Sequence, residues 1–208
     1  MKHLINYGLL LIVVCLASCN KERTDTTIDQ TGNKPAFKNG NGPTTKVTYT
    51  FSSDAVGSFT ISLIAPTIVK VHQDFSFSNT TPFALTTGYV EGYDDLTIPT
   101  FPARFFGGTL RFAGPGNDSL FGAVTVQTSV FTDPINPSVG DFTGAEDFIG
   151  TFMITGGTGH YLNATGSGTY TAHSDYTPPA TPGVLFGGTT ELHATASVSV
   201  VPHMGNGQ

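Results

Sequence analysis

Apolar and polar residues alternate along most of the chain from residue 46 onward. A period of two is typical of β-strands with one buried face, and glycine- and proline-rich segments separate the alternating runs. The pattern predicts two strands over residues 47–52 and 59–63, joined as a hairpin by a turn at 54–57. A third strand is predicted over residues 69–77.

The second half of the chain continues this pattern. Residues 104–112 and 120–127 are predicted to pair across a turn at 113–118, and the last strand covers about residues 185–201. Between residues 78 and 103 the alternation is weak, and one or two short strands are expected around 85–90 and 96–98. About eight antiparallel strands with one apolar face indicate either a β-sandwich or a closed barrel.

A hairpin over residues 151–173 is the clearest local feature of the sequence. Phe152 and Ile154 alternate with threonines, and the alternation resumes near residue 168. Between the two runs lie Gly156, Gly157 and Gly159, a residue type that accepts positive φ without steric cost. We therefore expect the chain to reverse at these three glycines.

The sequence of this hairpin also resembles that of a known family. Residues 154–161, Ile-Thr-Gly-Gly-Thr-Gly-His-Tyr, and the following Ala-Thr-Gly of 164–166 are similar to a hairpin of the dirigent and allene oxide cyclase barrels. The resemblance implies an all-β, antiparallel, calycin-type closed barrel of about eight strands, and a homo-oligomer that by family likeness is a trimer. It also implies an isomerase or cyclase, or a dirigent-like protein, acting on a small apolar substrate in the barrel. The families' active-site residues have no counterparts that can be placed in this sequence.

Paired glycines recur inside two predicted strands, at 107–108 and 187–188. Interior glycines of this kind mark bulges or sharp bends, which a small closed barrel needs at its corners. A transmembrane barrel is the competing architecture, with its apolar face outward. Most of the predicted strands are shorter than the roughly 9–11 residues that cross a bilayer, so the pattern favours a barrel with an apolar interior.

The first 18 residues have the pattern of a secretory signal. Lys2 precedes an apolar run at 9–16 that is too short for a membrane helix. The run ends in Leu-Ala-Ser-Cys at 16–19, which resembles a bacterial lipobox and implies that Cys19 is lipidated and anchors the chain to the outer membrane. Asn-Lys-Glu at 20–22 is similar to the tether of surface-exposed Bacteroidota lipoproteins.

The expected organisation is therefore a signal peptide over 1–18, a lipidated cysteine with a disordered tether over 19–45, a barrel domain over 46–203 and a disordered tail over 204–208. The tether is expected because its segment carries almost no large apolar side chains. With Cys15 removed and Cys19 lipidated, no disulfide is expected.

Charge narrows the range of partners. The formal net charge is −6, and loss of residues 1–18 removes Lys2 and no acidic residue, which leaves −7. The remaining basic residues are scattered and form no stripe, so nucleic acid is not expected as a partner. The expected partners are the membrane, through the N-terminal lipid, and a small apolar ligand.

The sequence offers no constellation typical of catalysis. His72, His173 and His193 fall on polar faces of their strands, and with 174–184 taken as a loop the last two lie roughly 26 Å apart, so no metal site is predicted. The acidic run at 91–95 is interpreted as a solvated loop, and Glu146 with Asp147 as surface residues. No Gly-X-Ser-X-Gly motif is present and no cofactor is expected.

The barrel interior is the remaining candidate site. Eight strands can enclose either a packed core or one small ligand. Strand parity places a set of bulky aromatic residues inside, as core or as ligand-lining side chains: Tyr49, Phe51, Phe59, Phe75, Phe106, Phe112, Phe152 and Tyr170. The sequence therefore favours a non-catalytic barrel for binding or surface interaction, with the isomerase, cyclase or dirigent-like protein as the alternative.

Overall fold

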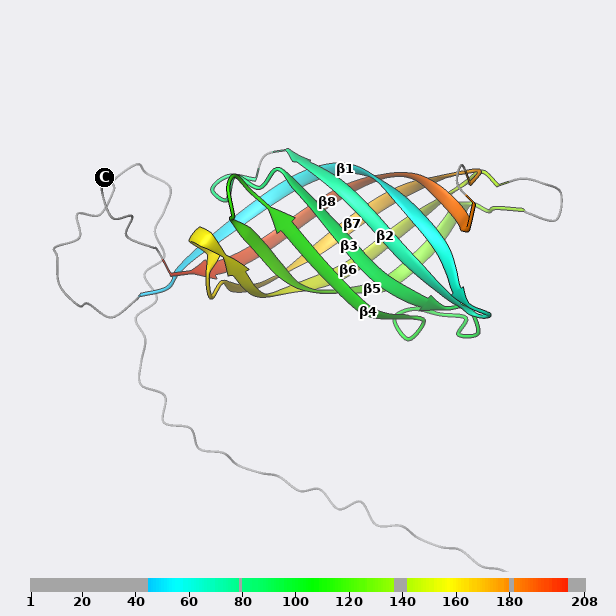
Figure 1. Ribbon diagram of the computed structural model, residues 1–208, viewed down its shortest axis with the longest axis horizontal. Coiled ribbons are helices and arrows are strands. Elements are labelled where there is room, and N and C mark those ends of the chain that lie inside the picture. Colours follow the sequence, from blue (N-terminus) through cyan, green and yellow to red (C-terminus); the bar gives the residue numbers. More distant parts are fainter. Residues whose placement is uncertain (1–44, 79, 137–141, 180–181, 202–208) are drawn as a thin grey trace, which may run out of the picture.

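The computed structural model describes residues 45–78, 80–136, 142–179 and 182–201. Eight antiparallel strands form one closed barrel, in which each strand pairs with the next and β8 pairs with β1 (Figure 1). The strands are β1 (Val47–Ala65), β2 (Ile68–Ser78), β3 (Thr87–Asp95), β4 (Phe105–Ala113), β5 (Ser119–Asp133), β6 (Gly144–Thr158), β7 (Thr165–Thr177) and β8 (Val184–Val200). The predicted all-β, eight-stranded closed barrel is confirmed, whereas the signal peptide, the tether and the tail lie outside the described residues.

The first predicted hairpin is wrong, because residues 47–65 form one long strand. Across the expected turn at 54–57, Asp54 and Gly57 pair with β2 on one side and with β8 on the other. The inward parity runs unbroken through Phe51, Ala55 and Phe59, which are all buried. Hydrogen bonding on both edges outweighs the local turn propensity of this segment.

The weak region between residues 78 and 103 holds one strand, where one or two were expected. β3 includes the whole acidic run at 91–95, which the sequence analysis interpreted as a solvated loop. The expected strand at 96–98 is instead a turn, in which the backbone N–H of Leu96 donates to the carbonyl of Thr67 at 2.8 Å. The Asp95 carboxylate holds this turn by accepting from both the backbone N–H and the hydroxyl of Thr97.

The central hairpin is present, but the chain reverses later than predicted. Gly156 and Gly157 lie within β6 and pair with β5, and the reversal follows in the short 3₁₀ helix η2 (Gly159–Tyr161). Gly159 has a φ of +58° and supplies the left-handed conformation that the turn requires. A Cβ at Gly157 would lie 2.3 Å from the carbonyl oxygen of Tyr161, so close packing explains that glycine.

The two ends of the barrel differ. Val47 and Val200 lie at the same end, where Figure 1 also shows the connections after β2, β4 and β6. We call this the plugged end, because Phe83 in the connection after β2 folds into the lumen with 2% of its surface exposed. Its ring packs against those of Phe51 at 5.1 Å and Tyr161 at 5.5 Å. The opposite end is called the cavity end below.

The strands contain 9–19 residues, so the expectation that they are too short to cross a bilayer is wrong. The polarity of the outer face is the better evidence on architecture. Thr48, Thr50, Ser52 and Asp54 occupy the exposed positions in the first part of β1, where a transmembrane barrel would carry apolar residues. Within the part of the chain that the structure describes, no helix has the length and apolar character needed to span a membrane.

Candidate functional site

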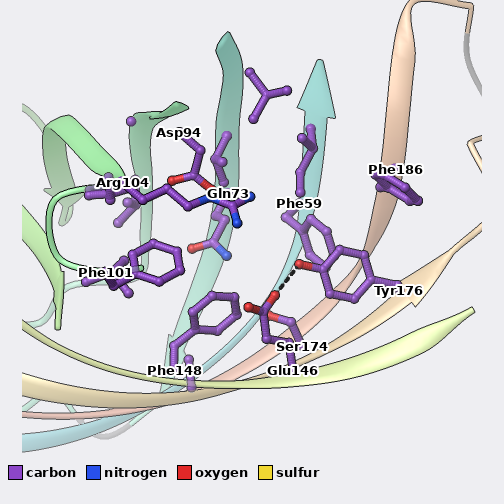
Figure 2. Close-up of a pocket in the computed structure, with 18 of the residues that line it drawn as sticks. Phe59, Gln73, Asp94, Phe101, Arg104, Glu146, Phe148, Ser174, Tyr176 and Phe186 are labelled. Atoms are coloured by element: carbon purple, nitrogen blue, oxygen red, sulfur yellow. Dashed lines mark hydrogen bonds and ion pairs between the residues drawn. The ribbon is translucent and has the colours of Figure 1, made fainter. Parts of the chain in front are cut away.

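A cavity of about 170 Å³ lies in the lumen at the cavity end of the barrel. Its walls come from every strand and from the connection between β3 and β4, so residues far apart in sequence converge there (Figure 2). Aliphatic side chains such as Ile61, Val69 and Val126 cover part of the wall. The rest of the wall is mainly aromatic, with a few ionisable groups and the neutral polar side chains of Gln73 and Ser174.

Aromatic rings make up a large share of this wall. Phe59 and Tyr176 pack edge to face with their centroids 4.9 Å apart, and Tyr176 also contacts Phe186 at 6.0 Å. The full aromatic set in the wall is Phe59, Phe101, Phe105, Phe131, Phe148, Tyr170, Tyr176 and Phe186. The cavity therefore offers flat, polarisable surfaces to a ligand.

Asp94 and Arg104 form an ion pair on one side of the cavity, and Figure 2 shows their side chains directed toward each other. The Arg104 Nε lies 3.6 Å from Asp94 Oδ2, too far for a hydrogen bond. Asp94 Oδ1 and Arg104 Nε are buried without a hydrogen-bond partner among the described residues. Burial, reinforced by the charge of Glu146 and opposed by Arg104, raises the pKa of Asp94 to about 6.

Glu146 lies across the cavity and is 5% exposed. The Tyr176 hydroxyl donates to its Oε2 at 2.6 Å, as drawn in Figure 2, and the Ser129 hydroxyl donates to Oε1. With both oxygens accepting hydrogen bonds, the group has the arrangement of a carboxylate. Burial raises the pKa of the Tyr176 phenol, and the neighbouring Glu146 charge raises it further, so Tyr176 stays a donor.

These polar residues were missed by the sequence reasoning. Asp94 was interpreted as part of a solvated loop and Glu146 as a surface residue, and both interpretations are wrong; only Asp147 of the second pair is exposed. The alternation of inward and outward positions along each strand could have revealed them. Glu146 shares the parity of Phe152 in β6, and Tyr176 shares that of Tyr170 in β7, so each continues the apolar face of its strand into the cavity.

Seven of the eight predicted lumen residues lie inside the barrel. Phe59 and Tyr170 line the cavity. Phe75, Phe112 and Phe152 surround a smaller gap of about 40 Å³ further along the lumen. Tyr49 and Phe51 pack against the core at the plugged end, where Tyr49 contacts Phe83 edge to face.

Phe106 is the exception, and its predicted inward position is wrong. It is 45% exposed and stacks on Tyr93 on the outer face. The register of β3 against β4 shifts between Glu91 and Tyr93, where Gly107 takes a φ of +63°. This bulge reverses the parity of the strand, so Phe105 instead of Phe106 enters the cavity.

The three strand histidines His72, His173 and His193 lie on the outer face, as predicted, and each lies within hydrogen-bonding distance of a carboxylate. His193 Nδ1 is 2.7 Å from Asp54, and His173 Nδ1 is 2.7 Å from Asp147, whose partnership raises the pKa of His173. The predicted separation of His173 from His193 is wrong, because β7 continues to Thr177 and His173 pairs with Glu191. In the described ranges, no group of three or more His, Cys, Asp or Glu residues could hold a metal ion.

No protein-family model, no curated protein and no solved structure matches the chain.

Proposed function

We propose that the barrel binds one small, largely apolar ligand in the cavity and does so without catalysis. The observation that supports this most strongly is the contrast between the two ends of the lumen. Phe83 fills the plugged end, whereas the other end keeps an open volume of about 170 Å³ surrounded by aromatic and aliphatic walls. Concave, mostly apolar sites with a few convergent polar groups are typical of small-molecule binding.

The proposal extends to the setting of the barrel. We propose that Cys19 carries lipid and anchors the chain to the outer membrane, on either its periplasmic or its outward face. The chain enters the barrel at Val47, at the end opposite the cavity. A tether to the membrane would therefore leave the cavity end directed away from the anchor, where it can take up ligand from the surrounding medium. A dirigent-like or allene oxide cyclase-like identity, with its trimer, remains part of the proposal.

A fluorescent probe can test the binding claim on residues 20–208, which include every strand and the complete closed sheet. We expect the neutral apolar dye N-phenyl-1-naphthylamine to bind with one site per chain. Ala172→Trp, which places an indole in the cavity, should abolish the binding. Its neighbour Thr171 is exposed on the outer face, so Thr171→Trp is the matched control and should bind as the wild type does. Equal binding by both variants would refute the proposal.

A second function, acid–base isomerisation of the bound ligand, is favoured by Asp94. Its carboxyl is buried, lines the cavity and has its pKa raised to about 6, near the range in which a group can both donate and accept a proton. If the barrel is an isomerase, a ligand recovered from the host should convert to an isomer of equal mass with the wild type. Asp94→Asn should bind the ligand without converting it. If the wild type does not convert the ligand, the isomerase function is refuted and only the binding function remains.

A further inference from the structure

The cavity contains more buried negative charge than positive charge. Of the ionisable groups in its wall, Asp94 and Glu146 are acidic and Arg104 is basic. Arg104 pairs with Asp94 and not with Glu146, whose partners are the hydroxyls of Ser129 and Tyr176. A buried charge is normally matched by a charge of opposite sign. Among the described residues of this cavity, Glu146 has no such match.

The rest of the wall suits a cation as well. Aromatic faces attract ammonium groups through their quadrupoles, and this attraction grows when the site is shielded from water. Arg104 already uses one of them, with its guanidinium carbon 5.6 Å from the centre of the Phe101 ring. Phe148 and Phe59 stand close to the Glu146 side of the cavity in Figure 2. A carboxylate among such rings is a common means of holding an organic ammonium ion.

We propose that the ligand of this cavity is an apolar amine, bound as its monocation with the ammonium group at Glu146 and the hydrocarbon part against the aromatic wall. The inference rests on the proposed binding function and narrows it to one ligand class. The carboxylate of Glu146 still has acceptor capacity beyond its two hydroxyl partners, since a carboxylate has about four lone-pair sites. A ligand carboxylate in the same place would face two acidic groups and is excluded by repulsion.

Three probes of equal chain length test this assignment: octylamine, octanol and octanoate, measured by calorimetry at pH 7 with residues 20–208. We expect octylamine to bind at least about tenfold more tightly than octanol, the ratio that one charge-assisted hydrogen bond supplies, and octanoate most weakly. In Glu146→Gln the preference of octylamine over octanol should disappear while octanol binding is kept. Glu191→Gln, which removes an exposed acid of β8 on the outer face, is the matched control and should keep the preference.

The possible results distinguish the amine assignment from the binding function on which it rests. If octanol binds and octylamine binds no better, or if octanoate binds best, the amine assignment is overturned and the apolar binding site stands. If Glu146→Gln keeps the full preference for octylamine, the ammonium group does not lie at Glu146 and the assignment fails. If none of the three probes binds to the wild type, the binding function itself fails. Where a probe does bind, loss of its binding in Ala172→Trp confirms that the signal comes from the cavity.

Discussion

At the scale of single residues, the polar groups of the cavity decide what the barrel can do. Asp94 and Arg104 form one pair in the largely apolar lumen, and Glu146 forms a second group with the hydroxyls of Tyr176 and Ser129. The positions of Asp94, Glu146 and Tyr176 follow from strand parity, which the sequence displays, whereas Arg104 lies in the turn before β4. Their burial could not be predicted, because charged residues are rarely buried and the local composition around residues 91–95 is that of a loop.

The pH dependence of stability should expose the buried state of Asp94. Its pKa is about 6 in the folded protein and 3.8 in the unfolded chain, so the folded state binds the proton more tightly and stability falls as pH rises through 6. Asp94→Asn imitates the protonated form. We expect this variant to be more stable than the wild type at pH 8, by at most about 3 kcal/mol. The difference should shrink as pH is lowered through 6 and vanish near 4, as measured by urea denaturation.

Arg104 and Glu146 are the charged groups that face Asp94, and a variant of Glu146 serves as a control for this curve. Glu146→Gln should move the wild-type transition to lower pH, because the Glu146 charge raises the Asp94 pKa. An Asp94→Asn variant whose stability relative to the wild type is the same at pH 8 and at pH 4 would contradict the account.

The Tyr176 hydroxyl provides a second test. Tyr176→Phe removes a donor from a buried carboxylate and should lower the free energy of unfolding by about 1–3 kcal/mol. The matched control is Tyr170→Phe. Tyr170 lies in the same strand and lines the same cavity, and its hydroxyl donates only a 3.4 Å hydrogen bond to the Thr125 carbonyl. We expect a clearly smaller loss there. Equal losses in chemical denaturation would show that the Glu146 contact is not what makes Tyr176 important.

At the scale of elements, local signals and barrel closure compete. The number of strands and most of their positions could be predicted from alternation, because the core faces of β2, β5, β6 and β8 carry regular apolar residues. The predicted break at 54–57 failed, because a turn-like sequence between two partner strands is held extended by hydrogen bonds from both. The bulge at Gly107 reversed the parity of one strand, and only the register with β3 reveals it.

The connection after β2 is a structural plug, and its removal should cost stability without affecting the cavity. Phe83 packs against Tyr49, Phe51 and Tyr161, so Phe83→Ala is expected to destabilise by about 3–5 kcal/mol. Phe106→Ala, on the outer face, should cost no more than about 1.5 kcal/mol. Thermal denaturation measures both. If Phe83→Ala also abolished dye binding in a variant that stays folded, the separation of the two ends would be wrong.

At the scale of the whole molecule, the two ends of the barrel differ in structure. The chain enters and leaves at the plugged end, and the cavity with its unmatched carboxylate lies at the other. A closed sheet follows from the alternation pattern, but the contrast between its ends does not, because it depends on which connection folds inward. That contrast is the reason to assign the barrel a ligand.

The most direct measurement is mass spectrometry of what residues 20–208 retain after incubation with an extract of the host cell. The wild type and Thr171→Trp should each release about one small molecule per chain on denaturation, and the molecule should carry a basic nitrogen. Ala172→Trp should release none. Wild-type protein that stays empty in repeated preparations, or a molecule released equally by Ala172→Trp, would contradict a ligand-binding lumen.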